Sequence, residues 1–229
     1  MKKVFIGVGH GGSDSGAVGY VVEKTANLEI GLACADFLKK HGVSVKMSRE
    51  YDENDPLNLT ITECNLFKPD LAIDIHNNAG GGDGFEAFYH YKGGLSKTLA
   101  LNIEKYVLEI GQNSRGCKTK INGSGSDYYG FIRETSCPAV ICEGFFVDNI
   151  NDSKIGDEID EQRAFGVAYA KGILDTLCIK WYNDNVPCSN NTQNDKLYRV
   201  QVGAFKSLDN ANKFIDKLRE LGLNPFIVS

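Results

Sequence analysis

Short apolar runs alternate along this chain with longer segments of helical periodicity, and this alternation constrains the fold more than any other feature. Runs typical of buried strands occupy residues 4–8, 43–47, 71–75, 85–91 and 139–142. Segments in which apolar residues recur every three or four positions occupy residues 25–40, 57–67, 95–110 and 162–177. The alternation predicts an α/β fold with a mostly parallel twisted sheet and helices on both faces. Ligands of such sheets bind beyond the carboxyl ends of the strands, so we expect the chemistry there.

The composition is that of an ordinary globular protein with a mild acidic excess. Of 229 residues, 42% are hydrophobic, which is enough to bury a core and excludes a wholly disordered chain. The 25 Lys and Arg residues against 30 Asp and Glu residues give a net charge of −5, so we expect no nucleic-acid partner. The 7 cysteines form no CxxC pair, which favours reduced and mostly buried thiols over disulfides or a cysteine-ligated metal.

The composition changes after Trp181, where a polar stretch almost free of large apolar residues begins. Beyond it, residues 198–205 alternate like a strand, residues 211–221 have helical spacing, and residues 225–228 are extended again. We therefore predict a main domain over residues 1–180, a linker over 181–196 and a small C-terminal β-α-β appendage over 197–229. So small a unit rarely folds alone. It would dock, form a homodimer with a second copy, or be part of a truncated module.

The N-terminus has too short an apolar run for a secretory signal. Two lysines precede it, but only about five apolar residues come before Gly9 and His10, against roughly 7–15 in a signal peptide. No later stretch approaches the roughly 18 apolar residues of a spanning helix. We therefore expect a chain made in the cytoplasm without a signal peptide and without membrane insertion. Action outside the membrane would need another exit route.

Two of the 4 histidines follow predicted strands directly. His10 lies in a glycine-rich segment after the first strand, and His76 comes after the third. A single such histidine would be equally compatible with an incidental turn, but two at corresponding strand ends favour a metal site. Glu23 can add a carboxylate, and two histidines with one glutamate form a known catalytic zinc set. Glu143 ends another apolar run, where a carboxylate needs either a charged partner or a function.

Five ordered motifs between about residues 2 and 177 resemble zinc-dependent N-acetylmuramoyl-L-alanine amidases of type 3, a family of phage endolysins and bacterial autolysins. They lie at residues 9–19, 23–28, 48–49, 74–79 and 142–146. The resemblance implies that one zinc ion is bound by His10, Glu23 and His76, and that Glu143 is the catalytic carboxylate. It also implies a peptidoglycan hydrolase, which uses zinc-activated water to cut the amide between N-acetylmuramic acid and the L-alanine of the stem peptide. Without an export signal, such an enzyme is expected to be a phage endolysin released through a holin-type pore or by another non-classical route.

Residues 197–205, together with Ala211, Asn212 and Leu218, resemble the first half of a SPOR module. That family binds glycan strands stripped of their peptides, so the resemblance implies peptidoglycan as the partner of this segment. A complete module has two β-α-β halves and only one is recognisable here. A docking or dimerising appendage is therefore an equal alternative.

Three further interpretations concern the site and its reaction. Asn77, Asn78 and the glycine-rich loop 80–84 lie next to His76 and would contact substrate or simply form a turn. The same ligands could serve a zinc peptidase or deacetylase of the cell wall. A catalytically silent wall-binding protein is the third interpretation, but such proteins often lose a ligand or the general base, and here all four residues are present.

Overall fold

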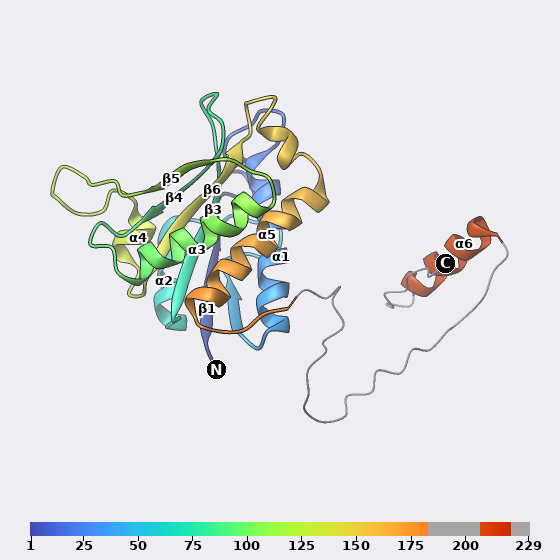
Figure 1. The fold of residues 1–229 in the computed structure, drawn as a ribbon, viewed down its shortest axis with the longest axis horizontal. Helices are drawn as coiled ribbons and strands as arrows, with labels where there is room; N and C mark the ends of the chain where they lie inside the picture. The colour runs from blue at the N-terminus through green and yellow to red at the C-terminus, as the bar shows by residue number, and fades with distance from the viewer. Residues whose placement is uncertain (183–206, 221–229) are drawn as a thin grey trace. The chain divides into compact units, whose positions relative to one another are not determined.

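The computed structural model describes residues 1–182 and 207–220 and divides the chain into two units, Met1–Asn183 and Asp184–Ser229. The first unit contains a six-stranded sheet with the order β2-β1-β3-β6-β4-β5 (Figure 1). Its strands are β1 (Lys3–Val8), β2 (Ser44–Met47), β3 (Leu71–Asn78), β4 (Phe85–Tyr89), β5 (Ser114–Lys118) and β6 (Ala139–Phe146). Its helices are α1 (Glu23–Lys40), α2 (Leu57–Phe67), α3 (Leu95–Glu109), α4 (Gly130–Glu134), the 3-10 turn η1 (Ser153–Ile155) and α5 (Ile159–Thr176).

The sheet is mostly parallel, as predicted. β1 runs parallel to β2 and β3, and β3 runs parallel to β6. β4 is antiparallel to β6 and parallel to β5. Residues 79–84 join β3 to β4, and a parallel crossover needs a dozen or more residues. The chain therefore turns back at the carboxyl end of β3, and β4 runs in the opposite direction.

Successive side chains of a strand point to opposite faces of the sheet, and each face is covered by a different set of helices. In β1, Val4, Ile6 and Val8 belong to a core that includes buried residues of α1, α3 and α5. Phe5 points to the opposite face and joins a smaller core with residues of α2 and α4. This period of two puts helices on both faces of the sheet, as the sequence predicts.

The boundaries of two strands differ from the prediction in a way that changes the position of the site. β3 continues past residue 75 to Asn78, and β6 continues past residue 142 to Phe146. His76 and Glu143 therefore lie within strands and not directly beyond them. The two strands stay paired because His76 is opposite Glu143 in the ladder, and the register shifts only between His76 and Asn78. The first helix also begins earlier than the predicted residues 25–40, because Glu23 is the first residue of α1.

The described part of the second unit is helix α6 (Leu208–Glu220), where the sequence predicts a helix over residues 211–221. The flanking strands predicted at 198–205 and 225–228, and residues 183–196 of the predicted linker, lie outside the described residues. Within residues 1–182 and 207–220, no helix has the length and apolar character needed to cross a bilayer. The six cysteines in this part of the chain are free thiols, and Cys34, Cys64 and Cys142 are buried.

Candidate metal centre

His10, Glu23 and His76 converge at the carboxyl ends of β1 and β3. His10 comes from the loop after β1, Glu23 from the start of α1 and His76 from β3. One ligand atom from each residue lies within 4.8 Å of the other two. In the described part of the chain, these three residues form a group of His, Cys, Asp or Glu side chains that is close enough to hold a metal ion. Glu23 Oε1 lies 3.2 Å from His10 Nε2 and 3.1 Å from His76 Nδ1. The structure thus brings together the three residues that the sequence analysis named.

Glu23 is held in place by backbone groups on both sides. The amide of Ala17 donates to Oε2 at 2.8 Å, and the amide of Asn77 donates to Oε1 at 3.1 Å. The carboxylate is buried, which alone would raise its pKa. Hydrogen bonds with His10 and His76 outweigh that effect and keep the pKa of Glu23 well below its usual range. The carboxylate is therefore ionised and oriented.

His10 depends on a backbone conformation that is unusual for its residue type. Its φ angle of 63° lies in the left-handed region. Nδ1 pairs with Asp14 Oδ2 at 2.9 Å, which leaves Nε2 directed at Glu23. Hydrogen bonding with Glu23 raises the pKa of His10. A carboxylate that holds one ring nitrogen while the other faces the ligand position is a common arrangement in metal sites.

Small residues allow the two imidazoles to approach each other. The rings of His10 and His76 are 5.0 Å apart between centroids, with planes at 86°. A Cβ atom added at Gly9 would lie 2.3 Å from the His76 ring, and one at Gly16 would lie 2.6 Å from both Glu23 and His10. A side chain at either glycine would therefore overlap the site. The tight packing explains why the loop needs glycine on both sides of His10.

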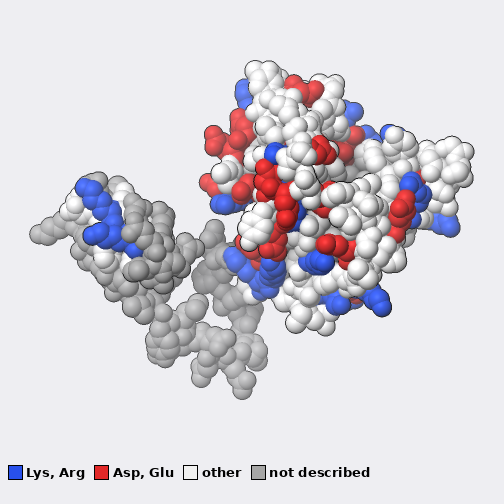
Figure 2. Space-filling model, turned by 180° about the vertical axis from the view of Figure 1, so that it is seen from behind, with Lys and Arg blue, Asp and Glu red and all other residues white. Residues whose placement is uncertain are grey.

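Acidic side chains surround the three donors. Asp14 contacts His10, and Asp74 Oδ2 lies 3.5 Å from His76 Nε2. Burial alone would lower the pKa of His76, but the charge of Asp74 raises it, and the net shift is well upward. Figure 2 shows acidic side chains gathered over the upper and central part of the rear face of the first unit. The negative charge of Asp14 and Asp74 beside the two histidines favours the binding of a cation.

The donor set fits a divalent zinc ion. Two imidazole nitrogens and one carboxylate oxygen are a known catalytic zinc set that leaves one coordination position open. In tetrahedral sites with bonds of about 2.0–2.1 Å, ligand atoms are separated by roughly 3.3–3.4 Å. The separations of 3.1 and 3.2 Å from Glu23 Oε1 to the two histidines are close to this value. The three ligand atoms all lie within 4.8 Å of one another, so the two histidine side chains can close on a metal ion by moving toward each other.

Glu143 lies beside this group but is not one of its donors. Its strand neighbour across the ladder is His76. Burial raises the pKa of Glu143 to about 7, with His76 opposing the shift and Glu23, Glu86 and Asp74 adding to it. Among the described residues, its carboxylate has no hydrogen-bond partner. A carboxylate without a partner beside a metal-binding group is suited to accept and return a proton.

The sequence matches the family described as N-acetylmuramoyl-L-alanine amidase over residues 4–175. The chain belongs to this family. A sporulation-specific N-acetylmuramoyl-L-alanine amidase of Bacillus subtilis (strain 168) is 31% identical over 233 residues, covering 100% of this chain and 85% of the relative. An endolysin of Bacillus phage SPP1 is 31% identical over 189 residues, covering 78% of this chain and 67% of that protein.

Solved structures show the same relationship. The catalytic domain of CwlV, an N-acetylmuramoyl-L-alanine amidase from Bacillus (Paenibacillus) polymyxa var. colistinus, is 30% identical and superimposes with a TM-score of 0.71. That alignment covers 79% of this chain and 100% of the CwlV domain. The sequence also matches the SPOR domain family over residues 168–229, a match whose first residues lie in α5 of the first unit. The amidase therefore combines a catalytic fold with a second, SPOR-type region.

The asparagines of the amidase that follow His76 have internal partners. Asn77 is 3% exposed, donates to Asn27 Oδ1 at 2.8 Å and accepts from the amide of Phe145 at 3.2 Å. These internal hydrogen bonds favour a structural role for Asn77 over contact with a substrate. Asn78 is half-buried and donates to Glu86 Oε1 at 2.8 Å. In the loop 80–84, the amides of residues 80 and 81 donate to the Asp148 carboxylate, which fixes the turn.

Arg49 supports the segments that carry the metal donors, a role that the sequence pattern does not indicate. It is 2% exposed, and its guanidinium donates to the carbonyl oxygens of Val8, Gly9, Lys24 and Tyr51 at 2.7–3.3 Å. These carbonyls belong to the end of β1, the loop that carries His10, the first turn of α1 and the loop after β2. Arg49 thus ties together the two segments that supply His10 and Glu23.

Arg49→Lys is expected to lower the free energy of unfolding by about 3 kcal/mol, since one ammonium group cannot satisfy four buried carbonyls. Urea denaturation followed by circular dichroism measures the change. Arg163→Lys is the matched control because Arg163 is 58% exposed and its nearest acidic contact is 3.4 Å away. Equal stability of the two variants would show that the guanidinium contacts of Arg49 do not stabilise the fold.

Proposed function

We propose that this chain hydrolyses the amide between N-acetylmuramic acid and L-alanine in peptidoglycan, using one zinc ion held by His10, Glu23 and His76. The observation that carries the proposal is the unpartnered Glu143 carboxylate beside three converging donors. Membership of the amidase family supports the bond that is cut. Similarity to the CwlV catalytic domain supports the arrangement of the sheet that carries the donors.

Zinc in this site would supply Lewis-acid chemistry, because it lowers the pKa of water to about 7 and polarises a carbonyl group. The protein's part is to hold the donors in the correct state. Asp14 keeps His10 Nδ1 engaged, so that Nε2 remains available. The backbone amides on Glu23 favour its ionised form, which is the form that binds a metal.

Glu143 is the catalytic carboxylate in this proposal. As a carboxylate it accepts a proton from the attacking water, and as a carboxylic acid it donates that proton to the departing alanine nitrogen. Its pKa near 7 suits both steps at neutral pH, because neither protonation state is strongly disfavoured. Proton transfer of this kind contributes typically about 10²–10⁴-fold to a rate.

Two other reaction classes use the same donors. A zinc peptidase or deacetylase would place a different bond at the site, and the family match favours the amidase over both. A catalytically silent wall-binding protein would not need an unpartnered carboxylate next to the donors. The presence of Glu143 therefore favours an enzyme.

The SPOR match supports peptidoglycan as the partner of the C-terminal region. We propose residues 1–180 as the catalytic domain, 181–196 as a linker and 197–229 as the wall-binding appendage. A homodimer formed through this appendage stays a prediction. The relatives include a sporulation-specific bacterial amidase and a phage endolysin, so we propose the cell wall as the place of action. Release through a holin-type pore stays a prediction.

Digestion of purified peptidoglycan, followed by mass spectrometry, tests this function. We expect new free amino groups on L-alanine, and a drop in their release of about 100-fold or more when a chelator removes the metal. Added zinc should restore the release. New reducing sugar ends, free acetate or cleavage between two amino acids would each contradict the amidase assignment. Release that a chelator does not change would contradict the use of zinc.

A further inference from the structure

Three ionisable side chains lie side by side across the sheet next to the candidate metal centre. In the ladder, His76 of β3 is opposite Glu143 of β6, and Glu143 is opposite Glu86 of β4. Adjacent strands are about 4.8 Å apart. Glu86 is thus placed two strands from His76, on the same face of the sheet. It belongs neither to the donor group nor to the proton-transfer step.

Glu86 is a buried carboxylate with two cationic neighbours on β5. Its side chain is 11% exposed, and its Oε2 accepts from Arg115 Nε at 3.2 Å and from Lys118 Nζ. Asn78 donates to its other oxygen. One cation would neutralise this carboxylate. With two, the group carries a surplus positive charge.

The guanidinium of Arg115 is fixed in orientation, but only one of its three nitrogens donates a hydrogen bond to a described residue. Nε is bonded to Glu86, and the guanidinium carbon lies 5.1 Å from the centre of the Phe146 ring. Within residues 1–182 and 207–220, its two terminal nitrogens have no hydrogen-bond partner. The side chain is 41% exposed, and that of Lys118 is 37% exposed. Such a pre-oriented fork matches the planar geometry of a carboxylate.

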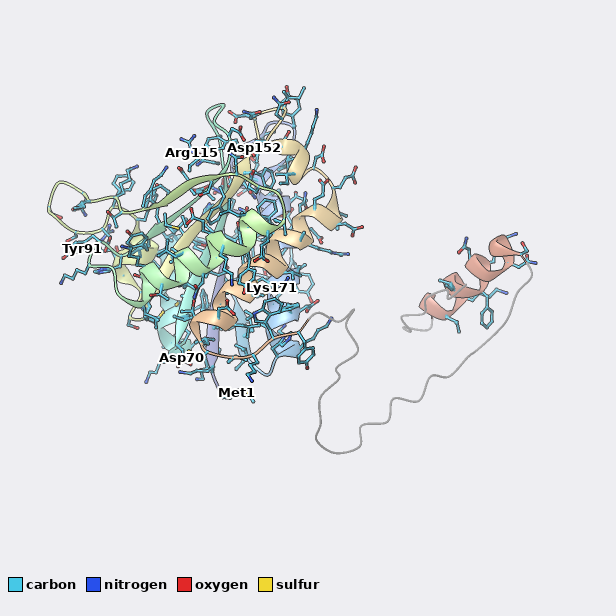
Figure 3. All side chains as sticks on the ribbon, viewed as in Figure 1. Met1, Asp70, Tyr91, Arg115, Asp152 and Lys171 are labelled. Atoms are coloured by element: carbon cyan, nitrogen blue, oxygen red, sulfur yellow. The ribbon has the colours of Figure 1, made fainter. Side chains whose placement is uncertain are left out.

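Arg115 is also at the correct end of the sheet. Figure 3 shows it at the end opposite Met1 and Asp70, which precede β1 and β3. It therefore lies at the end where these two strands deliver His10 and His76. β5 is three strands from β3, or about 14 Å. The Arg115 side chain crosses from β5 to Glu86 on β4, a distance of one strand spacing. Two spacings, or roughly 10 Å, then separate its guanidinium from His76 on β3.

We propose that Arg115, oriented by Glu86 and supported by Lys118, binds a carboxylate of the stem peptide on the far side of the scissile amide. This role of Arg115 rests on the proposed function, and it specifies in addition that the enzyme prefers a stem peptide with a free carboxylate. An extended peptide advances about 3.3–3.6 Å per residue. Starting from an amide held at the metal centre, the second or third stem residue reaches the fork. The surplus positive charge over Glu86 is then matched by the substrate.

Soluble muramyl peptides that differ only in amidation test the proposal. One series carries the second-residue carboxylate free or as an amide, and another varies the third residue in the same way. Wild-type protein should cleave one free acid with kcat/KM about 10- to 100-fold above its amide. In Arg115→Gln this preference should disappear through a higher KM for the acid, with kcat retained on the amide. Arg163→Gln, which removes an arginine on α5, should keep the preference.

The residue whose amidation matters identifies which carboxylate is bound. Equal cleavage of acids and amides by the wild type would overturn the proposal, as would an equal loss on all substrates in a folded Arg115→Gln. If Arg115→Gln does not fold, Arg115→Lys is the test: it keeps the charge beside Glu86 but loses the fork, so the preference should fall several-fold, and an unchanged preference would overturn the proposal. Failure of the proposed function is distinct, because then the wild type would free the N-terminal amine of L-alanine in neither series.

Discussion

Replacing Glu143 with glutamine is expected to lower kcat on a muramyl peptide by about 10²–10⁴-fold while zinc remains bound at one equivalent. Glutamine has nearly the same shape, but it cannot accept the proton of the attacking water. Glu143 is not one of the metal donors, so its loss leaves the three ligand atoms in place. Steady-state kinetics and elemental analysis of the same preparation give the two numbers.

Glu109→Gln is the matched control, since Glu109 is exposed at the end of α3. It should behave as wild type in both measurements. Turnover at the wild-type rate in Glu143→Gln would remove Glu143 from the proposed mechanism. Loss of zinc together with activity would instead identify Glu143 as a ligand, which the arrangement of the donors does not predict.

Replacing His10 with alanine is expected to abolish metal binding and activity together. The change removes one of three donors and leaves Asp14 and Glu23 without their shared partner. Loss of a residue that merely supports a ligand costs typically 10–100-fold in metal affinity, so loss of the ligand itself should cost at least about 100-fold. Isothermal titration with zinc, combined with an assay of the free N-terminal amines that appear on L-alanine of the stem peptide, measures both effects.

His90→Ala is the control for this variant, because His90 contacts Asp127 at 3.3 Å and is not part of the donor group. It should bind zinc as the wild type does. A His10→Ala protein that retains stoichiometric zinc with unchanged affinity would exclude His10 as a ligand. Its urea denaturation curve shows whether the fold is intact.

The architecture could be predicted from the sequence where burial determines the pattern. The strands under α1, α3 and α5 are apolar because they are covered, and their periodicity is visible without a structure. β5 was not predicted, because this strand at the sheet edge has the sequence Ser-Arg-Gly-Cys-Lys and none of its residues is fully buried. α4 was missed because it is only 5 residues long.

The site could be predicted in part for a related reason. His10 and His76 follow apolar runs, which indicates the edge of the sheet where ligands collect. The apolar runs alone predict strands that end before His76 and before Glu143, whereas β3 and β6 continue through these residues. Polar residues can continue a strand when a neighbour completes the ladder, as the pairing of His76 with Glu143 does.

The supporting residues depend on contacts between distant segments. Arg49 is 40 residues or more from Val8 and Gly9, whose carbonyls it satisfies. Arg115 is 29 residues from Glu86. Neither pairing follows from periodicity, because each arises only when the strand order is known. Asp14 is the exception: it lies four residues after His10, so local spacing alone could have indicated the pair.

Anomalous diffraction at the zinc edge from crystals of the zinc-loaded protein tests the central claim most directly. We expect one strong peak with His10 Nε2, Glu23 Oε1 and His76 Nδ1 each within about 2.0–2.2 Å, and Glu143 outside the coordination sphere. A peak bound by cysteine sulfur, or one that leaves either histidine uncoordinated, would contradict it.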